Sequence, residues 1–71
     1  MASPEDDLAR FARRLREARH DRGWSQERLA DESGLHWTAV SKIERGEREP
    51  RLGTIMRLAR ALRMSAGDLL E

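Results

Sequence analysis

Residues 25–46 read SQERLADESGLHWTAVSKIERG, and this segment contains two short helical patterns on either side of a glycine. Ser25 is typical of a helix N-cap and predicts a short helix over Gln26–Ser33. Gly34 closes that helix, because glycine readily adopts the left-handed conformation with which many helices end. A second helix is predicted over roughly Trp37–Arg45. The segment therefore predicts a helix-turn-helix unit, in which two short helices are joined by a brief turn containing glycine.

Small and apolar residues occupy the positions where such a unit must pack. Ala30 is small enough for the two helices to cross closely, and Leu29 beside it faces inward. Leu35 follows the turn glycine and anchors the turn. On the second helix Val40 and Ile43 have the spacing of residues that share one face. These positions are expected to belong to the core.

Helical periodicity continues on both sides of this unit. Ser3 predicts a helix start near the N-terminus, and Gly23 ends that helix. Beyond the unit lies a fourth helix, and a capping box of Ser65 and Asp68 starts a fifth. No segment shows the alternating pattern of a strand, so the sequence predicts an all-α, compact five-helix fold with residues 1–71 as a single domain. Further positions expected in the core are Leu8, Phe11, Ala12, Leu15, Ala18, Trp24, Leu52, Ile55, Leu58, Ala59 and Leu62.

Composition argues against several classes of protein. A chain of 71 residues has room for one small core, and without cysteine it has no disulfide framework. With only two histidines, a metal site is not expected. The longest apolar runs are too short for a membrane span, and the acidic N-terminus does not resemble a signal peptide. No catalytic carboxylate pair, Ser/His/Asp set or phosphate-binding loop is found, so we expect a cytoplasmic protein that is not an enzyme and uses no cofactor.

The charges are unevenly distributed along the chain. The 14 Lys and Arg and the 13 Asp and Glu give a net charge of +1. All 14 basic residues lie within residues 8–63 together with eight acids, so this centre carries +6. Residues 1–7 carry −3 and residues 64–71 carry −2. A basic centre permits a polyanionic partner, although the same charges also suit solvated helix faces.

One face of the second helix of the unit combines cations, hydroxyls and an aromatic ring without an acid. Removing the inward positions leaves a continuous outward stripe of Trp37, Thr38, Ser41, Lys42 and Arg45. Lysine can donate to guanine, and serine or threonine can bind several acceptors on base edges. The stripe is therefore predicted to contact double-stranded DNA in the major groove, where the second helix of a helix-turn-helix can enter.

Several runs of sequence occur together at the spacing of one known family. They are WSQERLA at 24–30, GL at 34–35, VSKIERGEREP at 40–50, LARAL at 58–62 and LL at 69–70. Together they resemble the phage-repressor-like (Cro and repressor, XRE-type) helix-turn-helix family over about residues 9–70. The resemblance implies a five-helix, DNA-binding transcriptional regulator, which in this family is often a dimer on a palindromic site.

The resemblance also implies roles for individual residues. Gln26 matches the family glutamine whose side chain, with nearby backbone N–H groups, holds a DNA phosphate. Arg19 and Glu44 match a buried pair that ties the first helix to the third in some members. The residues that match base- or backbone-reading positions are Trp37, Thr38, Ser41 and Lys42, and those that match positions near phosphates are Arg45 and Arg48.

The chain departs from the family pattern at three positions. His36 stands where a Ser or Thr N-cap is common, which predicts a weaker cap, and Arg51 also replaces a small polar cap. Trp37 is unusual at its position, and it either touches DNA or leans on the second helix of the fold. Arg45 and Arg48 also allow two interpretations, since Glu44, Glu47 and Glu49 are close enough in sequence to neutralise them.

We therefore expect a sequence-specific transcriptional regulator, either a repressor or a controller, that binds a palindromic site as a homodimer and associates with the nucleoid. The alternative is an antitoxin or adaptor module whose main role is to bind a partner protein. The apolar residues expected at the dimer interface are Leu52, Met56, Met64 and Leu70.

Overall fold

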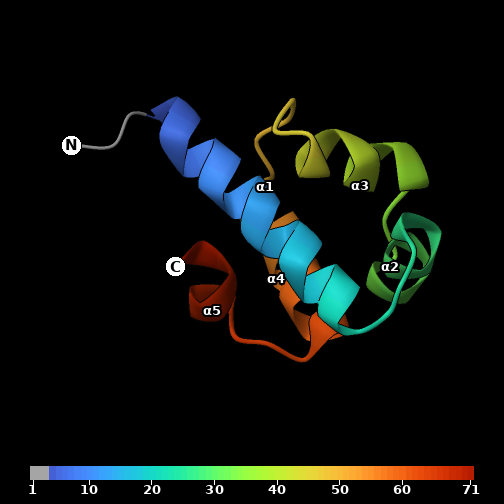
Figure 1. The fold of residues 1–71 in the computed structure, drawn as a ribbon. Helices are drawn as coiled ribbons and strands as arrows, with labels where there is room; N and C mark the ends of the chain where they lie inside the picture. The colour runs from blue at the N-terminus through green and yellow to red at the C-terminus, as the bar shows by residue number, and fades with distance from the viewer. Residues whose placement is uncertain (1–3) are drawn as a thin grey trace.

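The structure, a computed structural model, describes residues 4–71, with side chains from Asp7 onward. Ser3, the predicted N-cap of the first helix, lies outside the described residues. The helices, in chain order, are α1 (Pro4–Asp21), α2 (Gln26–Ser33), α3 (Trp37–Glu44), α4 (Leu52–Leu62) and α5 (Ala66–Leu70) (Figure 1). Residues 4–71 contain no strand, so the predicted all-α five-helix fold is confirmed.

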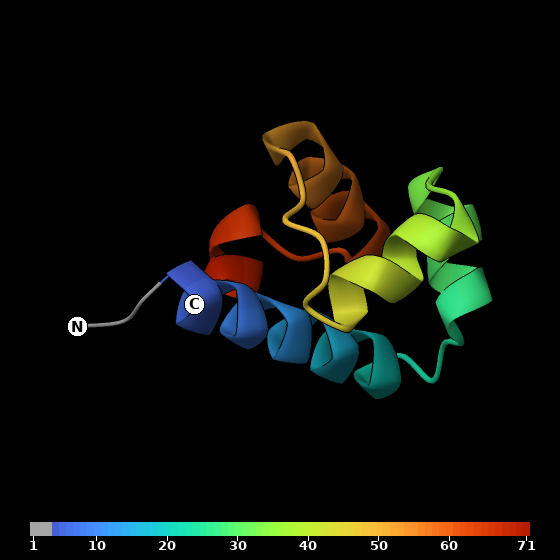
Figure 2. The ribbon, with the colours of Figure 1, turned by 90° about the horizontal axis from the view of Figure 1, so that it is seen from above.

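The long helix α1 supports the rest of the molecule. In Figure 1 it crosses in front of α4, and the view from above in Figure 2 separates these two helices. α1 packs against α3 and α5, while α2 packs against α3 and α4. The helix-turn-helix unit therefore sits at one end of the molecule, with α3 held from two sides.

All five helices contribute to one core. Leu15, Leu29 and Leu58 are completely buried, which brings α1, α2 and α4 together. Burial of such side chains is the main favourable contribution to folding, at about 1.5–3 kcal/mol each. The buried cluster consists of Phe11, Leu15, Ala18, Leu29, Ala30, Val40, Ile43, Leu58, Ala59, Leu62 and Leu69.

Local capping bonds fix the ends of the short helices. The Ser25 hydroxyl accepts a hydrogen bond from the Arg28 amide at 3.0 Å and starts α2. Gly34 ends α2 with φ at +71°, a left-handed conformation that strains a residue with a Cβ. Ser65 and Asp68 form both hydrogen bonds of the predicted capping box at α5. Since these signals are local, the bounds of α2 were predictable from the sequence alone.

The start of α4 combines an exposed leucine with an arginine N-cap. Leu52 is in helical register with Leu58 and Leu62 and was also expected at the dimer interface, and 71% of its surface is exposed. Ile55, in the same turn, packs partly buried against the core, whereas the Leu52 side chain points largely into solvent. Arg51 at the N-cap makes no side-chain capping bond, as its chemistry predicts. The first turn of α4 therefore presents a large apolar side chain to solvent.

Candidate nucleic-acid interface

Packing within the helix-turn-helix unit determines which face of α3 is free. Ala30 is buried where α2 meets the rest of the unit, and Leu35 packs partly buried against the core. The Leu35 amide donates to the Ala30 carbonyl at 3.0 Å and closes the turn. Val40 and Ile43 are buried and hold the inner side of α3. The outer side of α3 is left facing away from the core.

A shallow hollow of about 140 Å³ lies on the outer face of α3. The residues that line it are the five of the predicted stripe: Trp37, Thr38, Ser41, Lys42 and Arg45. The structure thus brings these five together, whereas Gln26 and Arg48 lie outside the hollow. Lys42 is exposed, and no acid lines the hollow, so its polar surface consists of cations and hydroxyls.

The first turn of α3 carries an aromatic ring and a histidine cap. About half of the Trp37 surface is exposed, so the ring is available to a ligand in the hollow. The His36 Nδ1 accepts a hydrogen bond from the Thr38 amide at 3.2 Å, and the Thr38 hydroxyl lies 2.8 Å from the same nitrogen. His36 therefore supplies a side-chain cap where the sequence predicted a weak one.

Ser41 differs from the expected outward stripe, because it is buried. Its hydroxyl oxygen accepts a hydrogen bond from Nη1 of Arg45 at 2.8 Å, one helical turn further along. The Arg45 side chain, which is itself about half exposed, runs back along α3 toward Ser41. Ser41 thus lines the hollow as a support for Arg45 and presents little surface of its own.

A carboxylate from the following loop also binds Arg45. Nε of Arg45 donates to one oxygen of Glu47 at 2.5 Å, and Nη2 donates to the other at 3.4 Å. The hydrogen bond from Arg45, together with the positive charges of Arg45 and Lys42, lowers the pKa of Glu47. Glu47 therefore stays ionised at neutral pH. Arg45 is therefore paired with Glu47 in the structure, while its contact with DNA stays a prediction.

The predicted pair between the first and third helices is present and buried. Arg19 donates from Nε and Nη2 to the two Glu44 oxygens at 2.7 and 3.0 Å, and only 1% of Glu44 is exposed. Gln26 joins the pair, since its Nε2 donates to Glu44 at 3.0 Å. Nη1 of Arg19 donates to the Trp24 carbonyl at 2.8 Å. This network fixes the Gln26 amide at the start of α2, beside α3.

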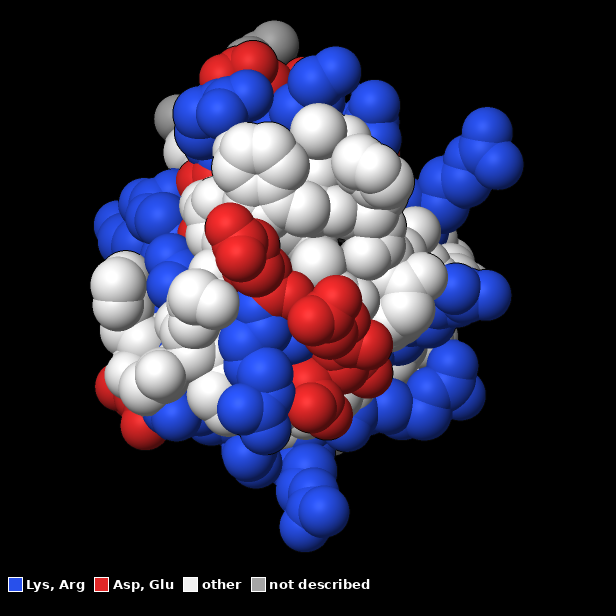
Figure 3. Space-filling view, turned by 90° about the vertical axis from the view of Figure 1, so that its right-hand side faces the viewer, with Lys and Arg blue, Asp and Glu red and all other residues white. Residues whose placement is uncertain are grey.

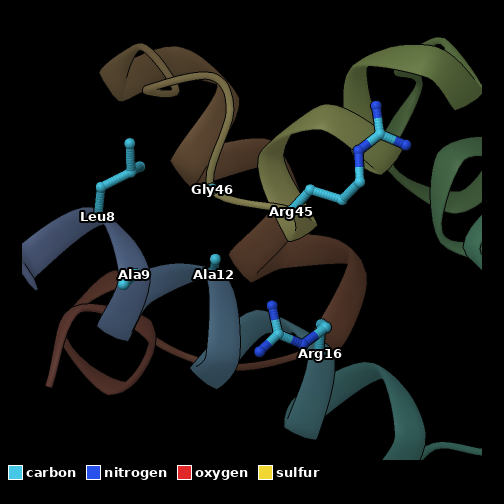
Figure 4. A pocket seen from close by; sticks show the side chains of 6 residues that line it. All are labelled: Leu8, Ala9, Ala12, Arg16, Arg45 and Gly46. Atoms are coloured by element: carbon cyan, nitrogen blue, oxygen red, sulfur yellow. The ribbon is translucent and has the colours of Figure 1, made fainter. Parts of the chain in front are cut away.

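A cleft of about 290 Å³ separates α1 from the end of α3, and Figure 4 shows the residues that line it. Arg16, on one wall, donates to the backbone carbonyl oxygen of Glu44. Arg45, on the other, directs its guanidinium away from Arg16, so the two cations do not converge on a common point. The cleft therefore lacks two converging cations that could bind a small anion. Its wall includes Arg16, whose hydrogen bond to Glu44 links α1 to α3.

Arg22 and Arg28 make contacts that were not predicted. The guanidinium carbons of Arg22 and Arg28 each lie 5.1 Å from the centre of the Trp24 ring. Arg22 also donates to the Leu62 carbonyl at 3.0 Å. The four-residue spacing of Trp24 and Arg28 was a detectable signal, but the Arg22 contacts depend on how the turn before α2 and the end of α4 approach each other.

The charge on the side of the molecule that carries α2 and α3 is mixed. Figure 3 shows acidic side chains gathered at the centre of this face, with Lys and Arg around them. The exposed acids of α2 include Glu27, Asp31 and Glu32, none of which lines the hollow on α3. No group of three His, Asp or Glu among the described residues could hold a metal ion. On this face, the basic residues therefore do not form one continuous positive patch.

Comparison with known families and proteins agrees with this geometry. The helix-turn-helix family profile matches residues 15–69. The chain belongs to the helix-turn-helix family. The control protein C.SmaI of Serratia marcescens is 44% identical over 60 residues, which cover 84% of this chain and 71% of that protein.

Two solved structures are similar to this helix-turn-helix protein in both fold and sequence. The crystal structure of the restriction-modification controller protein C.AhdI from Aeromonas hydrophila has a TM-score of 0.87 and 46% identity, covering 89% of this chain and 96% of that one. The hypothetical transcription factor NHTF from Neisseria has a TM-score of 0.90 and 38% identity, covering 100% and 82%. The predicted family, fold and role as a DNA-binding transcriptional regulator are thus confirmed. None of the helices within residues 4–71 is long and apolar enough to cross a bilayer.

Proposed function

We propose that α3 reads a specific DNA sequence in the major groove, with Trp37, Thr38, Ser41, Lys42 and Arg45 at the contact. The observation that carries this proposal is the hollow on the outer face of α3, which gathers these five residues without an acid. Lys42 and Arg45 supply donors for guanine acceptors or phosphates, and Thr38 supplies a hydroxyl. Ser41 acts mainly through Arg45, because it is buried beneath that side chain.

Gln26 and Arg48 are proposed to hold the DNA backbone on either side of the hollow. One N–H of the Gln26 amide binds Glu44, and a primary amide has a second N–H that can donate to a phosphate oxygen. The free N–H groups at the start of α2 reinforce this contact. Arg48 is exposed in the loop before α4, and we propose that it contacts a phosphate on the other side. Such contacts set the register of the protein on DNA, while base contacts give its specificity.

We further propose that residues 1–71 act as one domain that binds a palindromic site as a homodimer, as a repressor or controller in the cytoplasm and nucleoid. The core shared by all five helices supports a single domain. The likeness to control proteins supports a controller-type regulator that works without catalysis or a cofactor. Two copies would place their α3 helices in half-sites about one DNA turn apart, ~34 Å.

The experiment that tests the proposed function is selection of bound sites from a random DNA pool. We expect enriched sequences with two inverted half-sites about 10 base pairs apart from centre to centre. Enrichment of a single, asymmetric half-site would contradict the dimer, and a pool without enrichment would contradict sequence-specific recognition.

Lys42→Ala is expected to weaken binding to the selected site by about 1–3 kcal/mol and to lower the slope of log K against log salt by about one. The reason is that Lys42 is an exposed cation that lines the hollow, and no ion pair to it is found among the described residues. Fluorescence anisotropy over a salt series measures both quantities. Arg13→Ala is the control, since it removes an exposed cation of α1 that pairs with Glu17. Equal losses in both variants would remove Lys42 from the interface.

Leu52→Glu is expected to convert the proposed dimer into a monomer, as measured by sedimentation velocity. Leu52, Met56 and Leu70 expose 71%, 39% and 49% of their surfaces, whereas Met64 packs partly buried against the core and adds less to an interface. A buried carboxylate without a partner destabilises an association strongly. Arg13→Glu, on the exposed side of α1, is the control for an added acid. A Leu52→Glu protein with unchanged sedimentation would place the interface elsewhere.

A further inference from the structure

The guanidinium of Arg45 is held on two sides in the free protein. The two carboxylate oxygens of Glu47 accept hydrogen bonds from Nε and Nη2, at 2.5 and 3.4 Å. Ser41 accepts from Nη1 at 2.8 Å. All three nitrogens of the group therefore have an acceptor, and the orientation of its plane is fixed by two different elements, α3 and the loop that follows it.

One pair of donors remains after these contacts. A guanidinium carries five N–H groups: one on Nε and two on each terminal nitrogen. Glu47 and Ser41 use the N–H of Nε and one N–H on each of Nη1 and Nη2. One N–H on Nη1 and one on Nη2 are thus left without an acceptor among the described residues, and the outer edge of a guanidinium can present such a pair side by side. Two adjacent acceptors suit such an edge, and the O6 and N7 atoms of guanine provide them in the major groove.

Glu47 is held in place by the backbone at the end of α3. Its amide donates to the Lys42 carbonyl at 2.9 Å, and Gly46 before it has φ at +72°. The lowered pKa of Glu47 keeps the carboxylate charged at neutral pH. Glu47, which binds Arg45, thus has its backbone held by a hydrogen bond and its carboxylate ionised.

The charge of the pair favours a base over a phosphate as the partner of Arg45. Affinity for phosphates comes from net positive charge and counterion release, and a carboxylate within hydrogen-bonding distance of Arg45 cancels much of that gain. Base recognition, by contrast, depends on the orientation of the hydrogen-bond donors, and Glu47 does not reduce the ability of the two remaining N–H groups to donate. We propose that Glu47 is a positioning residue that aims Arg45 at a guanine and so sets the base preference of the protein. This inference rests on the proposed function, in which α3 lies in the major groove.

The test compares Glu47→Gln with Glu49→Gln, which removes the same charge two residues further along the loop. Glu49 is exposed, and no ion pair to it is found among the described residues. Each protein is titrated by anisotropy with the selected site, with the same site altered at single guanines, and with scrambled DNA. Wild-type protein is expected to prefer the critical guanine by about 5- to 150-fold, the range of a bidentate contact. That guanine is identified as the one whose preference is lost in Arg45→Gln.

Glu47→Gln is expected to lose most of this preference, while Glu49→Gln retains it within about twofold, the size of effect usual for a charge without a specific partner. Both variants should bind scrambled DNA more tightly than wild type and by similar factors, since each removes one negative charge. Adding Glu47→Gln to Arg45→Gln should change the guanine preference no further, because Glu47 acts through Arg45.

Two results would overturn the inference. One is an unchanged guanine preference in Glu47→Gln, and the other is a uniform change on every sequence, which would place Arg45 on a phosphate. Failure of the proposed function has a different signature, because wild-type protein would then not distinguish the selected site from scrambled DNA. Urea unfolding of the two glutamine variants checks that both fold as the wild type does.

Discussion

Glu44→Ala is expected to lower the free energy of unfolding by about 3–5 kcal/mol, the cost of breaking a buried ion pair from one side. Glu44 is 1% exposed and binds Arg19 through both oxygens. Its removal leaves the Arg19 guanidinium buried with the Trp24 carbonyl as its remaining strong acceptor, and it also deprives Gln26 of a partner. A chain of this length is expected to have a total stability of about 4–11 kcal/mol, so the loss is a large share of it.

Urea denaturation followed by circular dichroism measures this loss as a shift of the midpoint at unchanged slope. Glu17→Ala is the control, because Glu17 pairs with Arg13 and Arg14 on the exposed side of α1, where such pairs contribute about 0–1 kcal/mol. Replacing Arg19 and Glu44 together by leucine should recover much of the loss, since no unpaired charge is then left buried. A loss below about 1 kcal/mol in Glu44→Ala would contradict the buried pair.

Leu29→Ala is expected to destabilise the fold by about 2–5 kcal/mol, the range for removing most of a buried leucine. Leu29 is fully buried and belongs to the cluster that joins α2 to the rest of the core. Since α2 packs against both α3 and α4, a cavity at this position loosens the support of α3. Thermal unfolding and urea midpoints give the change in stability.

Leu29→Met is the control, because it replaces leucine without leaving a large cavity. Methionine nearly conserves the volume and usually costs less than about 1.5 kcal/mol. If both variants lose the same free energy, packing at this position does not determine the stability. If Leu29→Ala alone is destabilised, its affinity for DNA at a temperature where it remains folded shows whether α3 still presents the same surface.

Features that depend on neighbouring residues were predictable from the sequence. Ser25 and Gly34 bound α2 as expected, because a cap needs only the residues next to it. The stripe on α3 was predicted because its inner positions, Val40 and Ile43, are recognisable as apolar residues at helical spacing. The Arg19–Glu44 pair was predicted from the family resemblance, since its partners are far apart in sequence.

Features that depend on how helices, loops and long side chains pack over one another could not be predicted from the sequence. Leu52 has the helical spacing of Leu58 and Leu62, but 71% of its surface is exposed in the fold, which its spacing alone does not reveal. Ser41 has the spacing of a surface residue, but the long Arg45 side chain folds back over it. The Arg45–Glu47 contact joins a helix end to a loop, and its geometry follows from the left-handed turn at Gly46 and not from helical spacing.

The positions of the two tryptophans give the protein a built-in pair of optical reporters. The chain has two tryptophans and no tyrosine, so its near-ultraviolet emission comes almost entirely from these two rings. Trp24 packs against the core with two guanidinium groups close to its ring, so its emission responds to unfolding. Trp37 is about half exposed in the hollow on α3, where a bound ligand changes its solvent contact. Folding and occupancy of the candidate interface can therefore be followed separately, without an added label, in variants that keep only one of the two rings.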